Sequence, residues 1–364
     1  MVVWLTIVHS SLAQITVQKG KVVSESSSLI SSNTPIVNYG EIVQRGTLST
    51  ESDLLNYGNY DATQGSLALQ GSNQRIVSDS LTVAQLHIKG GNVKILEGKL
   101  EIKSSLYLEG GLLQVTESSQ LTLDEQVAIN QNNETSYVWG GVCHRGNGSK
   151  FFPVGTRDVY APLTLTNVQG NNPLVKATYE SIDGNPYWTQ TQLAGTYDGS
   201  PVTITFNSNN PDYEAYAQLL SITAGPASQQ TDIVLGSSLL RQDQSRYTLA
   251  SNQPTSLPWI SVGFTTEELQ EEVYVPNAFS PEATNPEDKA IKVYGRYLSF
   301  NNFHFGVQDS WGKWVYQTTS LEEATQTGWT TAGLNASTTK FRYVVSGRFL
   351  SGNSFQHSDI IVKF

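Results

Sequence analysis

A segment of twenty residues occurs twice in succession in the first third of the chain, and it limits the fold more than any other feature. LHIKGGNVKILEGKLEIKSS begins at Leu86, and LYLEGGLLQVTESSQLTLDE begins at Leu106, with Gly90-Gly91 aligned to Gly110-Gly111. Within each copy apolar residues alternate with polar ones, as in a half-buried strand, and glycines interrupt the alternation at turns. Each copy is therefore expected to form two or three short strands.

Strands of this kind cannot bury their apolar side alone, so the copies should stack on one another. We expect a short β-solenoid or β-helix-like domain over residues 14–135, to which the rows at 56–71 and 78–88 add earlier rungs. The alternative is an ordinary β-sandwich with evenly spaced hairpins, because two clear copies are fewer than the three that a stable stack usually needs.

The composition favours an all-β protein from outside the cytoplasm. Charged residues make up 15% of the chain, below the ~25% of an average domain, and helix formers are sparse. A length of 364 residues corresponds to about two to four compact units. The net charge is −10, and the chain has no basic stripe that would release counterions from phosphate, so a nucleic-acid partner is not expected. The single cysteine, Cys143, cannot form an internal disulfide.

The N-terminus has the pattern of a secretory signal. An apolar run from Val2 to Val8 is followed by Ser11-Leu12-Ala13, which predicts a signal peptide over residues 1–13 and cleavage before Gln14. The basic residues that usually precede such a run are missing, so a late start of the sequence or a buried strand are the alternatives. No later stretch reaches ~18 continuous apolar residues, so no transmembrane segment is expected.

The middle of the chain predicts a second β domain, over residues 136–264. From Tyr137 onward aromatic residues, glycine turns and prolines that end strands replace the repeat. Strand-like runs are separated by turns at Asp183-Gly184, Asp198-Gly199 and Asn209-Asn210-Pro211. This pattern is typical of an antiparallel β-sandwich. The ELQEE run at 268–272 is expected to be a linker or a single helical turn.

Catalytic motifs are absent from the sequence, so we expect neither an enzyme nor a cofactor or metal site. Cys143 and His144 are neighbours, and neighbours on a strand point to opposite faces, which argues against a nucleophile and base pair. Tyr187-Trp188 and Tyr213 with Tyr216 are candidates for a carbohydrate-stacking platform. Burial in a sandwich core is the favoured interpretation of these aromatic residues.

The last ninety-odd residues carry a series of short motifs in a recognisable order. VPNAFSP (275–281) is followed by IKVYGRY, then FHFGVQDSWGKWVYQT, GWTTAGLN and KFRYVVSGRFLSGNSFQHSDIIVKF. In this order the motifs resemble the gliding-motility-associated C-terminal domain, the type B targeting domain of the type IX secretion system. The resemblance covers residues 273–364 and gives the candidate partner-binding residues Pro276, Asn277, Phe279, Pro281, Trp311, Gly312, Trp329, Phe341 and Tyr343.

The pieces of this segment are consistent in physical terms with a small Ig-like β-sandwich, the fold expected from the resemblance. Pro276 and Pro281 bracket Phe279, so the chain should run extended there, with one aromatic side chain to pin the edge of the domain. Trp311-Gly312 lies between two strand-like runs, where Gly permits a hairpin turn and Trp is expected to cover the core. The final run, DIIVKF (359–364), should form a strand that pairs within the domain or offers an edge to a partner.

The segment departs from the family pattern at several turns. The family's Asn-Gly-Asp-Gly turn is replaced by residues 282–288, Ser310 stands where an Arg usually precedes Trp-Gly, and Trp-Asp-Gly appears as Trp329-Thr330-Thr331. The family's Tyr-x-Tyr strand reads Phe341-Arg342-Tyr343. These departures indicate a divergent member, which raises the question whether the domain still acts as ordinary cargo.

The resemblance implies export across the outer membrane of a Bacteroidota cell and residence at the cell surface, or release from it. Its implied partners are the type IX translocon channel and the associated outer-membrane shuttle or plug proteins. We therefore predict a non-catalytic surface protein that stays associated with the secretion or gliding machinery through residues 273–364. The alternative is an exported adhesin that binds a surface glycan and uses its C-terminal domain only as a secretion signal.

Overall fold

The computed structural model is an all-β protein, with 58% strand and 6% helix. It describes residues 2–3, 14–182, 184–226, 233–243, 245–266, 269–331 and 339–364. The signal peptide expected over residues 1–13 therefore lies, apart from residues 2–3, outside the described residues. The chain forms two compact units: Met1–Asn207 with Ser221–Gly263, and Ser208–Leu220 with Phe264–Phe364.

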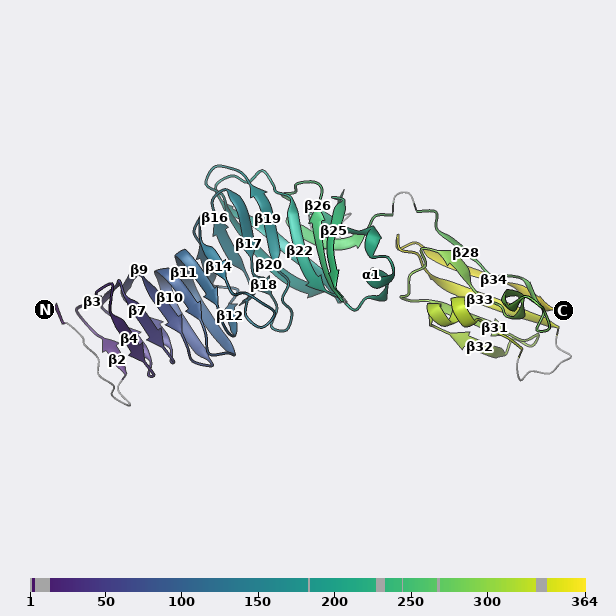
Figure 1. Ribbon diagram of the computed structural model, residues 1–364, viewed down its shortest axis with the longest axis horizontal. Helices are drawn as coiled ribbons and strands as arrows, with labels where there is room; N and C mark the ends of the chain where they lie inside the picture. The colour runs from purple at the N-terminus through teal and green to yellow at the C-terminus, as the bar shows by residue number, and fades with distance from the viewer. Residues whose placement is uncertain are drawn as a thin grey trace. The chain divides into compact units, whose positions relative to one another are not determined.

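Three ladders of parallel strands build the N-terminal part of the first unit (Figure 1). The first ladder contains β2 (Ile15–Val17), β5 (Ile36–Asn38), β8 (Leu54–Asn56), β10 (Gln74–Ile88), β11 (Val93–Leu108), β12 (Leu112–Val115), β15 (Val138–Trp139) and β18 (Val154–Gly155). The second contains β1 (Val2–Val3), β3 (Lys21–Ser24), β6 (Glu41–Gln44), β9 (Asn59–Leu69), β10, β11, β13 (Gln120–Leu123) and β16 (Val142–Arg145). The third contains β4 (Leu29–Ser32), β7 (Thr47–Thr50), β9, β10, β11 and β14 (Ala128–Asn130).

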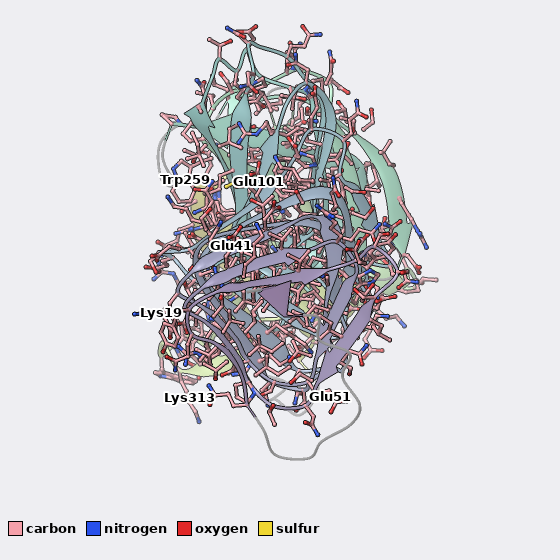
Figure 2. All side chains as sticks on the ribbon, turned by 90° about the vertical axis from the view of Figure 1, so that its left-hand side faces the viewer. Lys19, Glu41, Glu51, Glu101, Trp259 and Lys313 are labelled. Atoms are coloured by element: carbon pink, nitrogen blue, oxygen red, sulfur yellow. The ribbon has the colours of Figure 1, made fainter. Side chains whose placement is uncertain are left out.

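These ladders confirm the predicted β-solenoid. In a sandwich of hairpins, neighbouring strands run antiparallel, whereas the solenoid ladders are parallel and pair each coil with the next. The register follows the sequence repeat, because Leu86 pairs with Leu106 and Ile88 with Leu108. Figure 2 views the coils end-on, with Lys19 and Glu51 labelled at two different corners between the ladders.

Glycines at the corners allow successive coils to approach closely. Gly90 has φ 75°, and a β-carbon there would lie 1.8 Å from the carbonyl oxygen of Gln70 in the preceding coil. Gly111 has φ 88°, and a β-carbon there would lie 2.4 Å from the carbonyl oxygen of Asn92. Both the left-handed backbone and the missing space exclude a side chain at Gly90 and Gly111, which are one glycine of each repeated pair.

A two-layer β-sandwich follows the last coil in the first unit. Strand β16 pairs antiparallel with β20 (Leu174–Ile182), and this sheet continues through β21 (Asn185–Ala194), β27 (Trp259–Phe264), β23 (Leu220–Gly225) and β24 (Ile233–Val234). The second sheet has the order β17 (Gly148–Phe152), β19 (Leu163–Val168), β22 (Val202–Asn207), β26 (Arg246–Ser251) and β25 (Ser237–Asp243). Trp188 of β21 packs on Phe206 of β22 with 5.9 Å between ring centres, so the two sheets face each other.

The solenoid and the sandwich form one compact unit. Strands β15, β16 and β18 still extend the parallel ladders, so this pairing continues beyond residue 135, where the sequence predicted a new domain. Strand β16 belongs to both parts, since one edge pairs with β13 and the other with β20. The independence of residues 14–135 and 136–264 as folding domains stays a prediction.

The second unit contains a five-stranded sheet and a two-stranded sheet around one core. The larger sheet has the order β29 (Ala278–Phe279), β34 (Ser354–Lys363), β33 (Lys340–Arg348), β31 (His304–Gln308) and β32 (Trp314–Thr318). The smaller sheet pairs β28 (Glu272–Tyr274) with β30 (Tyr294–Arg296). Short helical segments complete the unit: α1 (Pro211–Ala215), η1 (Ala217–Leu219), η2 (Pro286–Lys289) and η3 (Glu323–Thr327).

Helix α1 is held in the second unit by a buried carboxylate. Asp212 accepts hydrogen bonds from Ser299 Oγ (2.7 Å), the Phe300 backbone N–H (2.6 Å) and Asn301 Nδ2 (2.8 Å). The hydroxyl of Tyr216 donates to the Leu298 carbonyl at 3.1 Å. Hydrogen bonds to a charged group are stronger than neutral ones, so these contacts explain why residues 208–220 fold with the C-terminal residues.

Candidate functional site

Four of the nine predicted partner-binding residues lie in the core of the second unit. Phe279 and Trp329 pack with 5.4 Å between ring centres, and Trp329 packs on Phe341 at 4.8 Å. Tyr343 is buried in the same core. These four side chains hold the second unit together, and Tyr343 also lines a surface hollow.

The segment with the two prolines runs extended and pairs with the end of the chain. The Val362 backbone N–H donates to the Asn277 carbonyl at 2.9 Å, and the Phe364 N–H donates to the Phe279 carbonyl at 3.0 Å. Strand β29 is therefore parallel to the last strand, β34. The side chain of Asn277 is exposed, and Pro276 and Pro281 are half-buried.

Trp311 projects into solvent, so the expectation that it covers the core is wrong. Its side chain is 83% exposed at the tip of the β31–β32 hairpin. Asp309 Oδ1 accepts hydrogen bonds from the backbone N–H groups of Trp311 (2.9 Å) and Lys313 (3.0 Å). Gly312 has φ 81°, which permits the tight turn. An Asp two residues before Trp-Gly was the sequence signal for this turn, because Asp favours such local bonds.

The tip therefore presents a large aromatic side chain on a turn with few free torsions. Exposed tryptophans are uncommon in monomers, and tryptophan is enriched among the residues that carry binding energy at interfaces. A turn that is already ordered loses little entropy when a partner binds. Trp311 is accordingly the strongest single candidate among the nine residues for direct contact with another protein.

A hollow of about 220 Å³ lies on the second unit over strands β33 and β34. Its lining includes Tyr274 and Asn277 on one side and Tyr343, His357 and Asp359 on the other. Tyr343 and Asp359 are directly paired across β33 and β34, so both point to the same face of the sheet. Burial, followed by the negative charge of Asp359, raises the pKa of Tyr343, which keeps its hydroxyl protonated as a hydrogen-bond donor.

The outer side of β34 borders this hollow. Strand β29 pairs with β34 only at residues 362–363, and the described residues place no strand beside 354–361 on that side. Ile360 is exposed while Ile361 is fully buried, because neighbouring residues on a strand point to opposite faces. An open strand edge can pair with an extended segment of another chain, and charged or polar residues such as His357 and Asp359 limit unspecific pairing.

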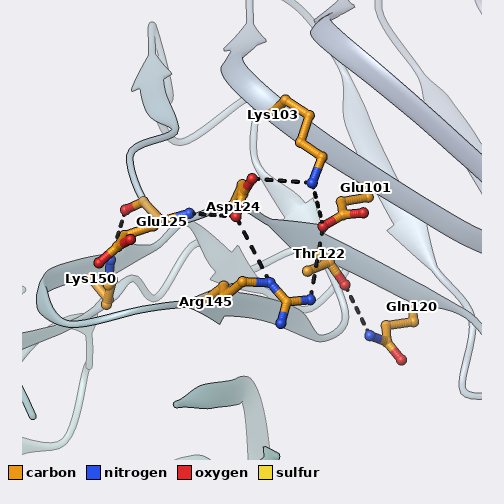
Figure 3. A network of polar contacts seen from close by, with 8 residues as sticks. All are labelled: Glu101, Lys103, Gln120, Thr122, Asp124, Glu125, Arg145 and Lys150. Carbon is orange, nitrogen blue, oxygen red and sulfur yellow. Dashed lines mark hydrogen bonds and ion pairs between the residues drawn. The ribbon is translucent and has the colours of Figure 1, made fainter. Parts of the chain in front are cut away.

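A charged network crosses the surface of the solenoid where it meets the sandwich (Figure 3). Lys103 Nζ lies 3.0 Å from Glu101 Oε1 and 3.1 Å from Asp124 Oδ2. Arg145 approaches the same two carboxylates at 3.8 Å. Partial burial is the largest single effect on Asp124 and opposes its ionisation. The hydrogen bonds from Lys103 and the Glu125 backbone N–H, with the charges of Lys103 and Arg145, together outweigh it, so the pKa of Asp124 is lowered. Asp124 directly follows β13, and it pairs with Lys103 on β11 and Arg145 on β16, so the network links these three neighbouring strands.

Cys143 and His144 are both buried and unsuited to nucleophilic catalysis. Burial raises the pKa of the Cys143 thiol to about 11, so the reactive thiolate is scarce at neutral pH. Burial, with the nearby Lys150 charge, lowers the pKa of His144 to about 4. His144 Nδ1 has no hydrogen-bond partner in the described part of the chain.

The aromatic residues that the sequence suggested as a sugar platform are dispersed through the fold. Trp188 is fully buried between the sheets, and its indole N–H donates to the Ala161 carbonyl at 2.8 Å. Tyr213 is buried against Phe264 with 5.6 Å between ring centres. The burial of Trp188 and Tyr213 agrees with the core interpretation.

No protein-family model matches this chain, and no curated protein is significantly similar to it. None of the described helices has the length and apolar content that a membrane-spanning helix requires.

Proposed function

We propose that this chain is a non-catalytic cell-surface protein that is exported by the type IX secretion system and remains associated with its secretion or gliding machinery. Residues 273–364 would make the contact, with the translocon channel or its outer-membrane shuttle and plug proteins as partners. The observation that carries the proposal is the second unit itself. Motifs that are scattered over ninety-odd residues of sequence contribute Phe279, Trp329 and Phe341 to one core, and that core supports the exposed Trp311.

Three surface features give such a partner something to recognise. Trp311 offers a large apolar contact at the hairpin tip, the hollow beside Tyr343 offers polar groups, and residues 354–361 of β34 offer backbone donors and acceptors. An extended segment of a partner would pair with the strand edge and place a side chain in the hollow. This mode needs no chemistry from the protein, in agreement with the buried and inactive state of Cys143.

Affinity purification of the full-length chain from outer membranes, at native expression, tests the association. We expect the translocon to be recovered in stoichiometric amounts with the wild-type chain and with Leu29→Ala, whose exposed side chain lies on the solenoid. Trp311→Ala should recover much less of it, because it removes the displayed indole without disturbing the core. Recovery of the wild-type protein alone, from the culture medium, would contradict the proposal.

The alternative function is an exported adhesin that uses its C-terminal domain only as a secretion signal. The two functions predict different effects of a deletion on the export of other proteins. Deletion of residues 273–364 should impair the export of other secreted proteins if the chain is part of the machinery. An adhesin with the same deletion would accumulate in the periplasm and leave other exports unchanged. The deletion also removes the partners of Asp212, so Trp311→Ala in the full chain serves as the milder companion variant.

A further inference from the structure

Two exposed tyrosines stack on each other at one corner of the solenoid. Tyr39 follows β5 and Tyr57 follows β8, so they occupy the same place in successive coils. Their rings lie 5.4 Å apart with 19° between the planes, and the side chains are 55% and 57% exposed. Both rings are held together at the surface. Because neither ring fills the core, packing of the fold does not explain their presence.

A buried polar ladder directly behind the tyrosines fixes this corner. Asn38 Nδ2 donates to Asn56 Oδ1 at 2.7 Å, and Asn56 Nδ2 donates to Ser78 Oγ at 2.9 Å. Asn38 also donates to the Asn59 carbonyl at 3.0 Å and accepts from the Gly40 backbone N–H at 3.0 Å. Because satisfied buried networks are rigid, the backbone that carries the tyrosines is held in place.

The next coil does not continue the aromatic stack. It places Asp79 and Ser80 at this corner, where the pairing between β10 and β11 shifts register between Ser78 and Leu81. The change from tyrosine to small polar residues leaves a hollow of about 580 Å³ beside Tyr57. The hollow is lined by Asn56, Tyr57, Gly58, Asn59, Tyr60, Asp61, Thr63, Asp79, Ser80 and Thr82.

The lining combines the exposed ring of Tyr57 and the buried Tyr60 with hydrogen-bonding groups whose only charges are negative. Asp61 accepts from the Thr63 backbone N–H (3.0 Å) and hydroxyl (2.7 Å) through Oδ1, which leaves its other oxygen for a ligand. These bonds from Thr63 lower the pKa of Asp61, so it is ionised and a strong acceptor. Asp79 and Ser80 also line the hollow, and both are exposed.

We propose that this hollow is a binding site for a neutral carbohydrate. A sugar ring has an apolar C–H face that packs on an aromatic ring, while its hydroxyl groups donate to carboxylates and exchange hydrogen bonds with Asn59 and Ser80. Tyr39 supports the ring of Tyr57 from the preceding coil. Small-molecule sites are usually concave and mostly apolar, with a few directed polar groups; the more polar lining of this hollow suits a ligand rich in hydroxyl groups.

Other ligand classes fit the same residues less well. The carboxylates of Asp61 and Asp79, in a chain of net charge −10, repel phosphate, sulfate and acidic polysaccharides. An apolar peptide would bury these carboxylates without a partner, which is costly. The described residues contain no group of three or more His, Cys, Asp or Glu side chains placed to hold a metal ion, so a cation does not account for the tyrosine pair.

Titration of the full-length protein with neutral oligosaccharides tests the proposal. Hexasaccharides of glucose, xylose, mannose and N-acetylglucosamine are the probes, with a hexamer of galacturonic acid as the anionic control. Saturation-transfer NMR identifies which probe binds, and calorimetry gives its affinity. We expect one of the neutral probes to bind in the presence of a chelator, with saturation transfer strongest at the protons of one sugar-ring face.

Substitutions then locate the site. Tyr57→Ala should weaken binding at least tenfold, equivalent to about 1.4 kcal/mol, and Tyr57→Phe should retain most of it because the ring remains. Asp79→Asn should also weaken binding, whereas Leu29→Ala, an exposed apolar residue elsewhere on the solenoid, should leave it unchanged. Circular dichroism of each variant checks that the solenoid is intact.

The proposal is overturned if no neutral probe binds at millimolar concentration, if only the anionic hexamer binds, or if Tyr57→Ala and Leu29→Ala have equal affinity. This site does not depend on the proposed association with the secretion machinery, since its residues belong to the first unit. If the wild-type protein recovers the translocon but binds no neutral sugar, only the sugar site is refuted. If it binds a sugar but does not recover the translocon, only the association is refuted.

Discussion

The burial of His144 predicts a loss of stability at mildly acidic pH. The side chain is 4% exposed on β16, packs edge-on against Phe152 at 5.9 Å and leaves Nδ1 without a partner in the described part of the chain. Burial and the Lys150 charge lower its pKa from 6.5 to about 4. The folded protein therefore holds a neutral imidazole over a pH range in which the unfolded chain binds a proton.

The sign and size follow from proton linkage. Above pH 6.5 both states are neutral at His144, so its contribution to stability is complete. As the pH falls from 6.5 to about 4, the unfolded state gains a proton that the folded state excludes, and stability drops by 1.36 kcal/mol per unit of pKa difference. A difference of roughly 2.5 units corresponds to about 3 kcal/mol, with no further loss from this residue at lower pH.

His144→Leu isolates this contribution from that of the carboxylates, because leucine fills a similar volume and does not titrate. Hydrogen exchange of peptides that contain β16 gives the local free energy of opening, after correction for the intrinsic exchange rate at each pH. We expect the free energy of opening of the wild type, taken relative to that of the variant, to fall by about 3 kcal/mol between pH 7 and pH 4. A difference that stays constant over this range would refute the reasoning.

Three further predictions concern the two units separately. Gly90→Ala should destabilise the solenoid by about 2 kcal/mol or more, and clearly more than Gly91→Ala, because both glycines have positive φ but only Gly90 lies against a backbone oxygen; equal melting temperatures for the two variants would contradict this. Asp212→Ala should destabilise the second unit by about 2 kcal/mol or more, because it leaves the donors around it unpaired; unchanged hydrogen exchange over residues 297–303 would contradict it. Trp329→Ala should cost about 3 to 5 kcal/mol, whereas Trp311→Ala should change thermal stability by less than about 0.5 kcal/mol; similar losses would show that their burial is misassigned.

The sequence predicted the solenoid where the repeat is regular. It did not predict the alignment of the coils where the spacing between paired residues varies. Leu86 and Leu106 are twenty residues apart and pair directly. In earlier coils the spacing varies, since Ile36 pairs with Leu54 and Leu54 with Ile76, eighteen and twenty-two residues apart. The corner turns differ in length, so a fixed period does not align Tyr39 with Tyr57.

Two features of the second unit depend on contacts that local patterns do not encode. Residues 208–220 read as part of the middle sandwich, whereas the bonds of Asp212 with residues 299–301 and of Tyr216 with Leu298 place them with the C-terminal residues. Trp311 reads as a core residue because tryptophan is usually buried, yet the turn bonded to Asp309 directs it outward. Phe279 and Phe341, which the resemblance gave as partner-binding residues, lie in the core instead.

The central claim, that the C-terminal unit contacts the export machinery, is tested most directly by photo-cross-linking in living cells. A photoreactive amino acid in place of Trp311 samples the hairpin tip, and the same group in place of Leu29 samples the exposed solenoid surface. The account predicts a discrete adduct with an outer-membrane component of the type IX translocon from position 311 and none from position 29. The same adducts from both positions, or no adduct from position 311, would contradict it.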